Sequence, residues 1–263
     1  MSIIYLDNAA TTFLKPKQAL KKTIHFLRKG YGNAGRSGHL LSMNTAEMIY
    51  NTRAMVARQL NFSNPDGIVF YHNATEALNV AIKTCIPKGA NVLTSYLEHN
   101  SVLRPLYSLQ SAGEISISHF SHKGNVGANI ENEIKANTKA IVCTLVSNVT
   151  GEEIDLSILS ELKRKYNLTV IVDATQLFCH KKIDLTKNTV DILCSAGHKG
   201  AFGMQGVAFS AFNFTPEHTY LEGGSGSETF SREMPKTMPD KMEAGTLSAP
   251  AIVSLYYGLE VVD

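Results

Sequence analysis

Short apolar runs alternate with amphipathic stretches along most of the chain. The apolar runs are rich in Val, Ile and Leu and do not alternate strictly with polar residues, which is typical of strands covered on both faces of a sheet. Strands are predicted at residues 68–71, 91–95, 114–118, 140–146, 169–173, 191–194 and 206–210. Amphipathic helices are predicted at residues 42–60, 74–85, 99–112, 156–166 and 247–262.

This alternation of strands and helices indicates an α/β domain with a mostly parallel, seven-stranded sheet and helices on both faces. We expect an N-terminal segment at residues 1–12 and one large domain at 13–246. Residues 247–263 are expected to begin a helix that leads out of that domain. Ligands of open parallel sheets bind beyond the carboxyl ends of the strands, so polar motifs directly after the strands are the functional candidates.

Composition narrows the class of protein. The 263 residues carry a net charge of +2 and are 44% hydrophobic and 18% charged, as in soluble globular proteins. The sequence has no basic cluster typical of nucleic-acid binding, no apolar run of membrane-spanning length and no signal-peptide pattern. The cysteines form no Cys-x-x-Cys pair, which favours a reducing compartment, and we expect a cytoplasmic protein.

Two strand ends carry residues that suggest one cofactor. The predicted strand at 191–194 leads into Ser-Ala-Gly-His-Lys-Gly at 195–200, and the strand at 169–173 ends in Asp173. An amine and a carboxylate at one sheet edge suit pyridoxal 5′-phosphate (PLP). This cofactor needs an amine for a Schiff base and a carboxylate that keeps its ring nitrogen protonated. Alternatively, Lys199 is a solvated loop lysine and Asp173 is a helix cap.

Motifs after the other strands can complete such a site. The segment at 72–79 opens a helix whose first N–H groups can bind a phosphate, and Thr75 adds a hydroxyl. His99 follows the second strand, and its flat ring can stack on a pyridine ring. Asn148 and Gln176 follow the fourth and fifth strands, within reach of a ring oxygen. Ordinary capping, a structural histidine and turn formation remain alternatives.

Two further segments have two interpretations each. The glycine-rich segment at 222–227 is either a flexible linker or a second phosphate-binding loop. The sequence Met-Glu-Ala-Gly-Thr at 242–246 is similarly ambiguous.

The motifs resemble, in order, those of the class V aminotransferases of fold type I, and within them the cysteine desulfurase and selenocysteine lyase group. The sequence Tyr-Leu-Asp-Asn-Ala-Ala-Thr-Thr at 5–12 is similar to the N-terminal signature of that group. The segment at 32–39 is similar to its next motif. The remaining matches lie at 73–79, 98–101, 147–151, 173–176, 197–199 and 243–246. Eight ordered motifs over nearly the whole chain make the resemblance specific.

The resemblance implies a role for each of these residues. Lys199 is similar to the lysine that forms the Schiff base with PLP and moves protons at the substrate carbon, and is expected to be catalytic. Asp173 is similar to the partner of the ring nitrogen, and His99 to a catalytic histidine stacked on the ring. The positions near the ring oxygen O3′ are Asn148 and Gln176. The phosphate-binding positions are Ala74, Thr75 and His198, with Ser225 and Thr246 contributed by the other subunit of a homodimer.

The activity implied by the resemblance is that of an enzyme of sulfur metabolism. It converts cysteine or selenocysteine to alanine, and an enzyme thiolate and then a sulfur-acceptor protein receive the sulfur. Another class V reaction, such as transamination or elimination, is an alternative, as is a paralogue that binds PLP without turnover. No metal site, nucleic-acid partner or membrane partner is expected.

The sequence departs from the family pattern in three places. Ala196 stands where relatives usually have a Ser or Thr that touches the phosphate, and the neighbouring Ser195 should point to the other side of the chain. Gly203-Met204 replaces a Gly-Pro pair. The sequence also stops at Asp263, before the region in which relatives carry a substrate-binding arginine and a sulfur-accepting cysteine. From these departures we expect a fragment, one part of a split gene or a degenerate paralogue.

Overall fold

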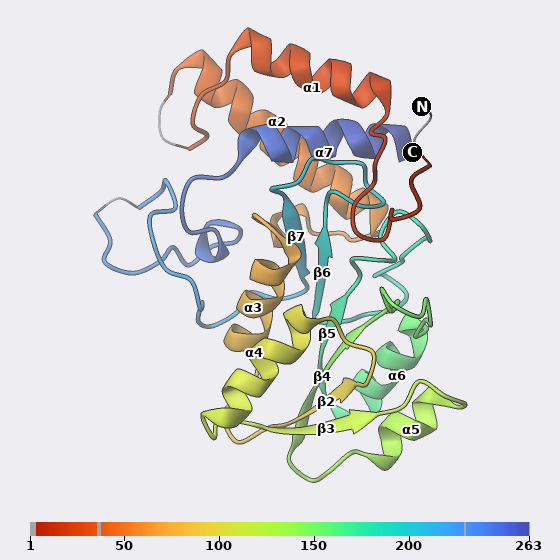
Figure 1. Ribbon diagram of the computed structural model, residues 1–263. Helices are drawn as coiled ribbons and strands as arrows, with labels where there is room; N and C mark the ends of the chain where they lie inside the picture. The colour runs from red at the N-terminus through yellow and green to blue at the C-terminus, as the bar shows by residue number, and fades with distance from the viewer. Residues whose placement is uncertain (1–3, 36–37, 229, 263) are drawn as a thin grey trace.

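A sheet of seven strands forms the centre of the computed structural model, which describes residues 4–35, 38–228 and 230–262 (Figure 1). The strand order is β1-β7-β6-β5-β4-β2-β3. β7 runs antiparallel to its neighbours β1 and β6, and the other neighbouring pairs are parallel, which confirms the predicted mostly parallel sheet. The strands are β1 (Ile68–Tyr71), β2 (Asn91–Ser95), β3 (Ser116–Phe120), β4 (Thr138–Thr144), β5 (Thr169–Asp173), β6 (Ile192–Ala196) and β7 (Ala208–Phe212).

Helices cover both faces of the sheet, and this explains why the strands lack strict alternation. Val92 and Ile171 are buried in a cluster with α3 and α4, whereas Leu93 and Val172 are buried in a second cluster with α2, α6 and α7. Successive side chains of one strand point to opposite faces, so both sets must be apolar. These helices are α2 (Leu40–Gln59), α3 (Ala74–Cys85), α4 (Asn100–Ser111), α6 (Leu156–Tyr166) and α7 (Ala249–Val262).

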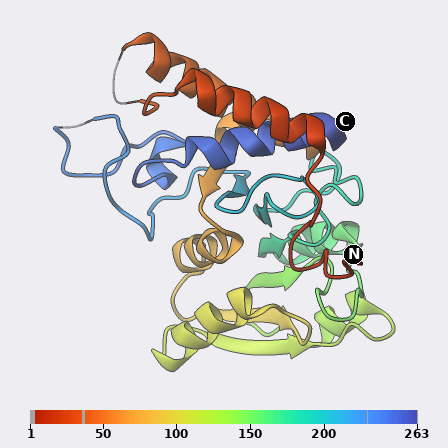
Figure 2. The same ribbon diagram turned by 45° about the horizontal axis from the view of Figure 1, so that its top comes forward.

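Two helices were not predicted, namely α1 (Lys17–Lys29) and α5 (Val126–Asn132). α1 lies along α7 at the top of the molecule (Figure 2). Its apolar residues Leu20, Ile24 and Leu27 recur at helical spacing, so the sequence contained a signal for α1 that the prediction missed. These three side chains are exposed, whereas the small residues Ala19 and Thr23 are buried.

Two strands begin two residues later than predicted because turns precede them. Gly206 has a φ of 97°, a conformation that favours glycine, and β7 therefore starts at Ala208 and not at 206. The amide of Gly113 donates to the carbonyl of Gln110, which completes a turn and delays β3 until Ser116.

The parallel strands bring five of the predicted motifs to one edge of the sheet. β1, β2, β4, β5 and β6 all run in the same direction, and each is followed by a segment singled out in the sequence. In the described ranges, no helix is long and apolar enough to cross a bilayer, and no cluster of His, Cys, Asp and Glu side chains can hold a metal ion.

Candidate active site

A cavity of about 440 Å³ lies at the carboxyl ends of the parallel strands, and we call it the Lys199 cavity. Eight of the ten residues predicted to bind the cofactor line it, from five separate strand ends. These eight are Ala74, Thr75, His99, Asn148, Asp173, Gln176, His198 and Lys199. The other two, Ser225 and Thr246, line a second cavity of about 520 Å³. The fold therefore brings together the motifs that follow the strands and holds the other two residues apart from them.

The N-terminal segment fixes the loop that carries Lys199. The hydroxyl of Thr12 donates to the carbonyl oxygen of Lys199 at 2.8 Å, and Nζ of Lys15 donates to the carbonyl oxygen of His198 at 2.6 Å. Nδ1 of His198 lies 2.9 Å from the hydroxyl of Thr11. The motif at 5–12 thus packs directly against the lysine loop.

Burial lowers the pKa of the Lys199 amine, whereas the negative charges of Asp173 and Asp7 oppose this shift. A lower pKa leaves more of the amine neutral near pH 7, and the neutral form is the nucleophile. Burial also lowers the pKa of His198, and the nearby charges of Lys199 and Lys15 add to the effect. Burial therefore disfavours the charged forms of both Lys199 and His198.

Asp173 is buried, with 6% of its surface exposed, and its Oδ1 accepts a hydrogen bond from the backbone N–H of Thr175 at 2.9 Å. The hydroxyl of Thr175 is buried and has no hydrogen-bond partner in the structure. Both residues line the Lys199 cavity. Since buried polar groups are normally paired, this hydroxyl and carboxylate are suited to a polar ligand.

Helix α3 begins at the Lys199 cavity. The side chain of Asn73 caps the helix by accepting a hydrogen bond from the N–H of Glu76 at 2.9 Å. The N–H groups of Ala74 and Thr75 lie in the first helical turn, where the helix itself offers no carbonyl partner. Such a turn is suited to binding an anion.

His99 caps helix α4 and is held by one neighbour. Its Nδ1 accepts a hydrogen bond from the N–H of Ser101 at 3.1 Å, so the neutral ring carries its proton on Nε2. The Ser101 hydroxyl lies 2.8 Å from the same Nδ1 and 2.8 Å from the hydroxyl of Thr75. This chain links the ring to the start of α3.

Beside His99 lies Glu98, which the sequence motif contains but to which no role was assigned. Its Oε2 accepts a hydrogen bond from the N–H of Thr144 at 2.8 Å, and its Oε1 is hydrogen-bonded to the hydroxyl of Ser95. Burial raises the pKa of Glu98 to about 8.

Other cavity residues were also missed, although the sequence contained a signal for them. Asp7, Ser101 and Thr175 are polar residues of quoted motifs to which no role was assigned. Ala196 lines the cavity, while Ser195 is fully buried and donates to the carbonyl of Ala196 at 3.4 Å. Ser195 thus points away from the cavity, as expected.

The cysteine thiols lie away from the Lys199 cavity. Burial raises the pKa of Cys85 and of Cys179 to about 12, and it raises the pKa of Cys143 and Cys194 as well. A sulfur nucleophile must be a thiolate, so these four thiols are poorly suited to that task.

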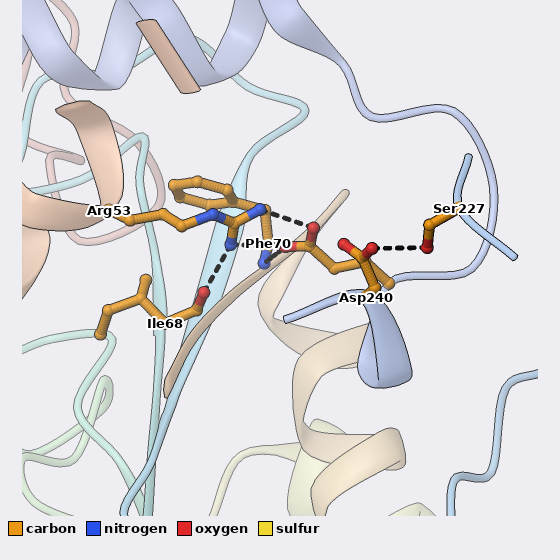
Figure 3. A network of polar contacts seen from close by, with 6 residues as sticks. Arg53, Ile68, Phe70, Ser227 and Asp240 are labelled. Carbon is orange, nitrogen blue, oxygen red and sulfur yellow. Dashed lines mark hydrogen bonds and ion pairs between the residues drawn. The ribbon is translucent and has the colours of Figure 1, made fainter. Parts of the chain in front are cut away.

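The second cavity is bordered by a buried ion pair (Figure 3). Arg53 donates to both carboxylate oxygens of Glu243, at 2.7 and 2.6 Å, and Glu243 also accepts from the N–H of Phe70 at 2.7 Å. The segment at 242–246 is therefore anchored to α2 and β1. It is in turn bonded to the glycine-rich segment, since the N–H of Gly245 donates to the carbonyl of Gly224 at 2.8 Å.

The glycine-rich segment is held in a second place. The hydroxyl of Ser227 donates to Asp240 at 2.6 Å. Neither of the two ambiguous segments is thus a simple flexible linker. The motif at 32–39 contributes Asn33 to this cavity, whereas its Arg36 and Ser37 lie outside the described residues.

A sequence profile of class-V aminotransferases matches residues 4–263. The chain belongs to the class V aminotransferase family. Among curated relatives of this class V protein, a probable cysteine desulfurase from Borreliella burgdorferi is 29% identical over 99% of the chain and 65% of its own length. A cysteine desulfurase from Wigglesworthia glossinidia brevipalpis is also 29% identical, over 99% of the chain and 66% of its own length. The chain described here thus spans about two thirds of the length of these relatives.

Solved structures show the same fold. An apo structure of cysteine desulfurase from Thermococcus onnurineus NA1 superimposes with a TM-score of 0.87 at 25% identity. The match covers 99% of the present protein and 67% of the Thermococcus chain. The cysteine desulfurase CsdA from Escherichia coli gives a TM-score of 0.82 at 24% identity and covers 98% of this chain and 67% of its own. These structures confirm the predicted α/β architecture and the predicted fold type I.

Proposed function

We propose that this class V family member binds PLP in the Lys199 cavity and acts on cysteine as a cysteine desulfurase. The observation that carries the proposal is the convergence of Lys199, Asp173 and His99 on one cavity that also contains the first turn of α3. Curated relatives named as cysteine desulfurases, matched over 99% of the chain, support the reaction.

The residues present fit PLP. The unpartnered hydroxyl of Thr175 and the buried carboxylate of Asp173 offer hydrogen-bonding capacity to a polar ring, and the amine of Lys199 can bond covalently to an aldehyde. Asp173 would hold the ring nitrogen, and His99 would lie on the ring face. The side chains proposed at O3′ are Asn148 and Gln176. The phosphate would be bound by Ala74, Thr75 and His198, where α3 begins.

When bound, PLP supplies an aldehyde that condenses with amino groups and a ring that withdraws electrons. The residues of the protein would move the protons and offset the charge of the ring. Lys199, whose pKa is lowered by burial, would take the proton from the α-carbon of the substrate and return it. Asp173 would accept a hydrogen bond from the ring nitrogen and offset its positive charge.

The substrate and the fate of the sulfur are part of the proposal. SspA, solved in complex with cysteine, superimposes with a TM-score of 0.84 at 25% identity, which supports cysteine as substrate, with selenocysteine as a close analogue. The carbon–sulfur bond of cysteine would break, leaving alanine, and a thiolate would become a persulfide. We assign that thiolate to none of the four cysteines of this chain, because burial raises the pKa of each.

A homodimer, a sulfur-acceptor protein and a cytoplasmic location complete the proposal. Ser225 and Thr246 line a cavity separate from Lys199, which supports their assignment to the site of a second copy. The four thiols are free, as suits a reducing compartment.

The test is the behaviour of cysteine on PLP-loaded protein, purified free of host desulfurases. In D₂O, deuterium should enter the α-carbon of cysteine, and alanine should form when a thiol reductant accepts the sulfur. Lys199→Ala should abolish both. Equal exchange in Lys199→Ala would overturn the proposal, and a product other than alanine would favour another class V reaction.

PLP binding without turnover is the second candidate function. Ala196 lines the cavity where relatives have a hydroxyl, so the phosphate end offers one donor fewer. This candidate predicts that the protein binds PLP but that cysteine shows no α-deuterium exchange.

A further inference from the structure

We propose that Glu98 is a positioning residue of the Lys199 cavity, which fixes His99 relative to the strand ends that carry Thr144 and Asp173. The inference rests on the proposed function, in which His99 lies on the ring of PLP. It adds a residue for which the sequence motif predicted no role.

Glu98 connects two strand ends. Its carboxyl group is hydrogen-bonded to the hydroxyl of Ser95, the last residue of β2, and accepts from the N–H of Thr144, the last residue of β4, at 2.8 Å. Only 9% of Glu98 is exposed, so water competes little for these bonds. The segment between β2 and α4 is thereby tied to β4 directly before His99.

The bond to Thr144 reaches the chemical centre of the cavity. Thr144 itself lines the cavity and pairs with Asp173 in the register of β4 and β5. The ring of His99 is held by Ser101, but Ser101 belongs to α4, and its hydrogen bonds join it to Thr75 and His99 and not to β4. Glu98 therefore sets the distance between the imidazole of His99 and β4, which is the neighbour of the strand that ends in Asp173.

The protonation of Glu98 suits this role. Burial raises its pKa to about 8, the hydrogen bonds from Ser95 and Thr144 oppose the rise, and the negative charge of Asp173 adds to it. The Ser95 hydroxyl donates to one Glu98 oxygen and the Thr144 N–H donates to the other, and a neutral carboxylic acid can accept both bonds. The neutral acid also avoids a second buried negative charge beside Asp173. A glutamine side chain of the same shape accepts from the Thr144 N–H through its oxygen and can donate to the Ser95 hydroxyl, which accepts as well as it donates.

The other end of the same strands provides a matched control. Asn91 is fully buried, its Nδ2 donates to the hydroxyl of Ser118 at 3.1 Å, and its Oδ1 accepts from the hydroxyl of Thr138 at 2.9 Å. It links β2 to β3 and β4 as Glu98 links β2 to β4, but at the amino ends, away from the cavity. Asn91→Ala therefore removes a comparable buried link without touching the site.

The experiment measures PLP affinity and the visible circular dichroism of bound PLP in wild type, Glu98→Ala, Glu98→Gln and Asn91→Ala. Glu98→Ala should bind PLP about tenfold more weakly, the loss expected from one or two buried hydrogen bonds, with a smaller dichroic signal. Glu98→Gln should stay within about twofold of wild type. Asn91→Ala should lower the melting temperature and leave the affinity unchanged. Equal affinity losses in Glu98→Ala and Asn91→Ala would overturn the proposal, as would wild-type affinity in Glu98→Ala.

A second readout needs no cofactor. In the apoprotein labelled with ¹⁵N-histidine, the His99 signal, assigned by its loss in His99→Asn, should report the single Nε2–H tautomer. Glu98→Ala should shift and broaden the His99 ring signals, because the ring is no longer held in one place relative to β4, whereas Glu98→Gln and Asn91→Ala should leave them at their wild-type positions. Unchanged His99 signals in Glu98→Ala would refute the positioning of His99. If wild type binds no PLP, the proposed function fails, and this spectrum still decides the role of Glu98.

Discussion

The two ends of strands β2 and β4 both bury polar side chains, but they do so in different ways. At the amino ends, Asn91 bonds to the hydroxyls of Ser118 and Thr138, and every group is neutral. At the carboxyl ends, Glu98 follows β2 and Asp173 ends β5, the neighbour of β4, so two buried carboxyl groups lie beside the Lys199 cavity. This part of the sheet thus carries a neutral, self-contained network at one end and buried carboxyl groups at the other.

This difference indicates which end has a function beyond stability. A neutral network stabilises the fold by about 1 kcal/mol per hydrogen bond and needs no ligand. Buried carboxyl groups are costly unless protonation or a partner of opposite charge offsets them. Burial raises the pKa of Glu98, and the buried carboxylate of Asp173 faces the cavity that contains the Lys199 amine. Titratable groups with shifted pKa values in or beside a cavity, here Lys199 and Glu98, are typical of active sites.

Asp173→Asn is expected to have the largest effect on activity. The amide keeps the shape but removes the charge that offsets a protonated ring nitrogen, so α-deuterium exchange should fall at least about a hundredfold. The measurement is exchange on cysteine with PLP at saturation. Retention of full exchange would show that the carboxylate at this strand end does not face the cofactor.

The pH dependence of stability distinguishes the carboxyl group of Glu98 from the neutral groups at the amino ends of the strands. Glu98 has a pKa of about 8 in the folded protein against 4.5 as its ordinary value, so the folded state binds the proton more tightly. The stability that this proton contributes is fully present below about pH 4.5 and is lost as the pH rises through 8.

Glu98→Gln should remove this dependence. Between pH 5 and pH 8 the melting temperature of wild type should fall by roughly 5 °C more than that of Glu98→Gln. Glu114→Gln, at a carboxylate paired with Lys88 at the surface, is the control and should follow wild type. Parallel curves for all three proteins would mean that Glu98 ionises normally.

Much of the fold was predictable because both faces of most strands are buried. Apolar runs marked most of the strands, and the polar residues that follow them marked the site. The edge strand β3 is partly exposed and its sequence alternates. The role proposed for Glu98 was not predictable, since it depends on the neighbouring position of β4, which local sequence does not contain. α1 was missed although Leu20, Ile24 and Leu27 recur at helical spacing.

Asn91→Asp would test the amino ends directly by placing a carboxylate there. The side chain of Asn91 is hydrogen-bonded to neutral hydroxyls, those of Ser116, Ser118 and Thr138, so the charge should destabilise the fold by about 2 kcal/mol. Chemical denaturation checks the loss, and PLP affinity should not change. If stability stayed at the wild-type value, buried charge would not distinguish the two ends.

Ala196→Ser is expected to have the smallest effect. Ala196 is the last residue of β6 and lines the Lys199 cavity, so a hydroxyl there can donate to a phosphate. PLP affinity should rise by up to about tenfold, as expected for one hydrogen bond of 1–1.4 kcal/mol. Equilibrium titration of PLP measures it, and a weaker affinity would mean that another group already occupies this place.

Reductive labelling shows whether the carboxyl ends of the parallel strands bind PLP through Lys199. Wild-type protein is incubated with PLP, treated with borohydride and mapped by mass spectrometry. We expect a pyridoxyl phosphate group on Lys199 and none on the half-buried Lys15 near it. A label on Lys15, on another lysine or on none would show that Lys199 does not hold the cofactor.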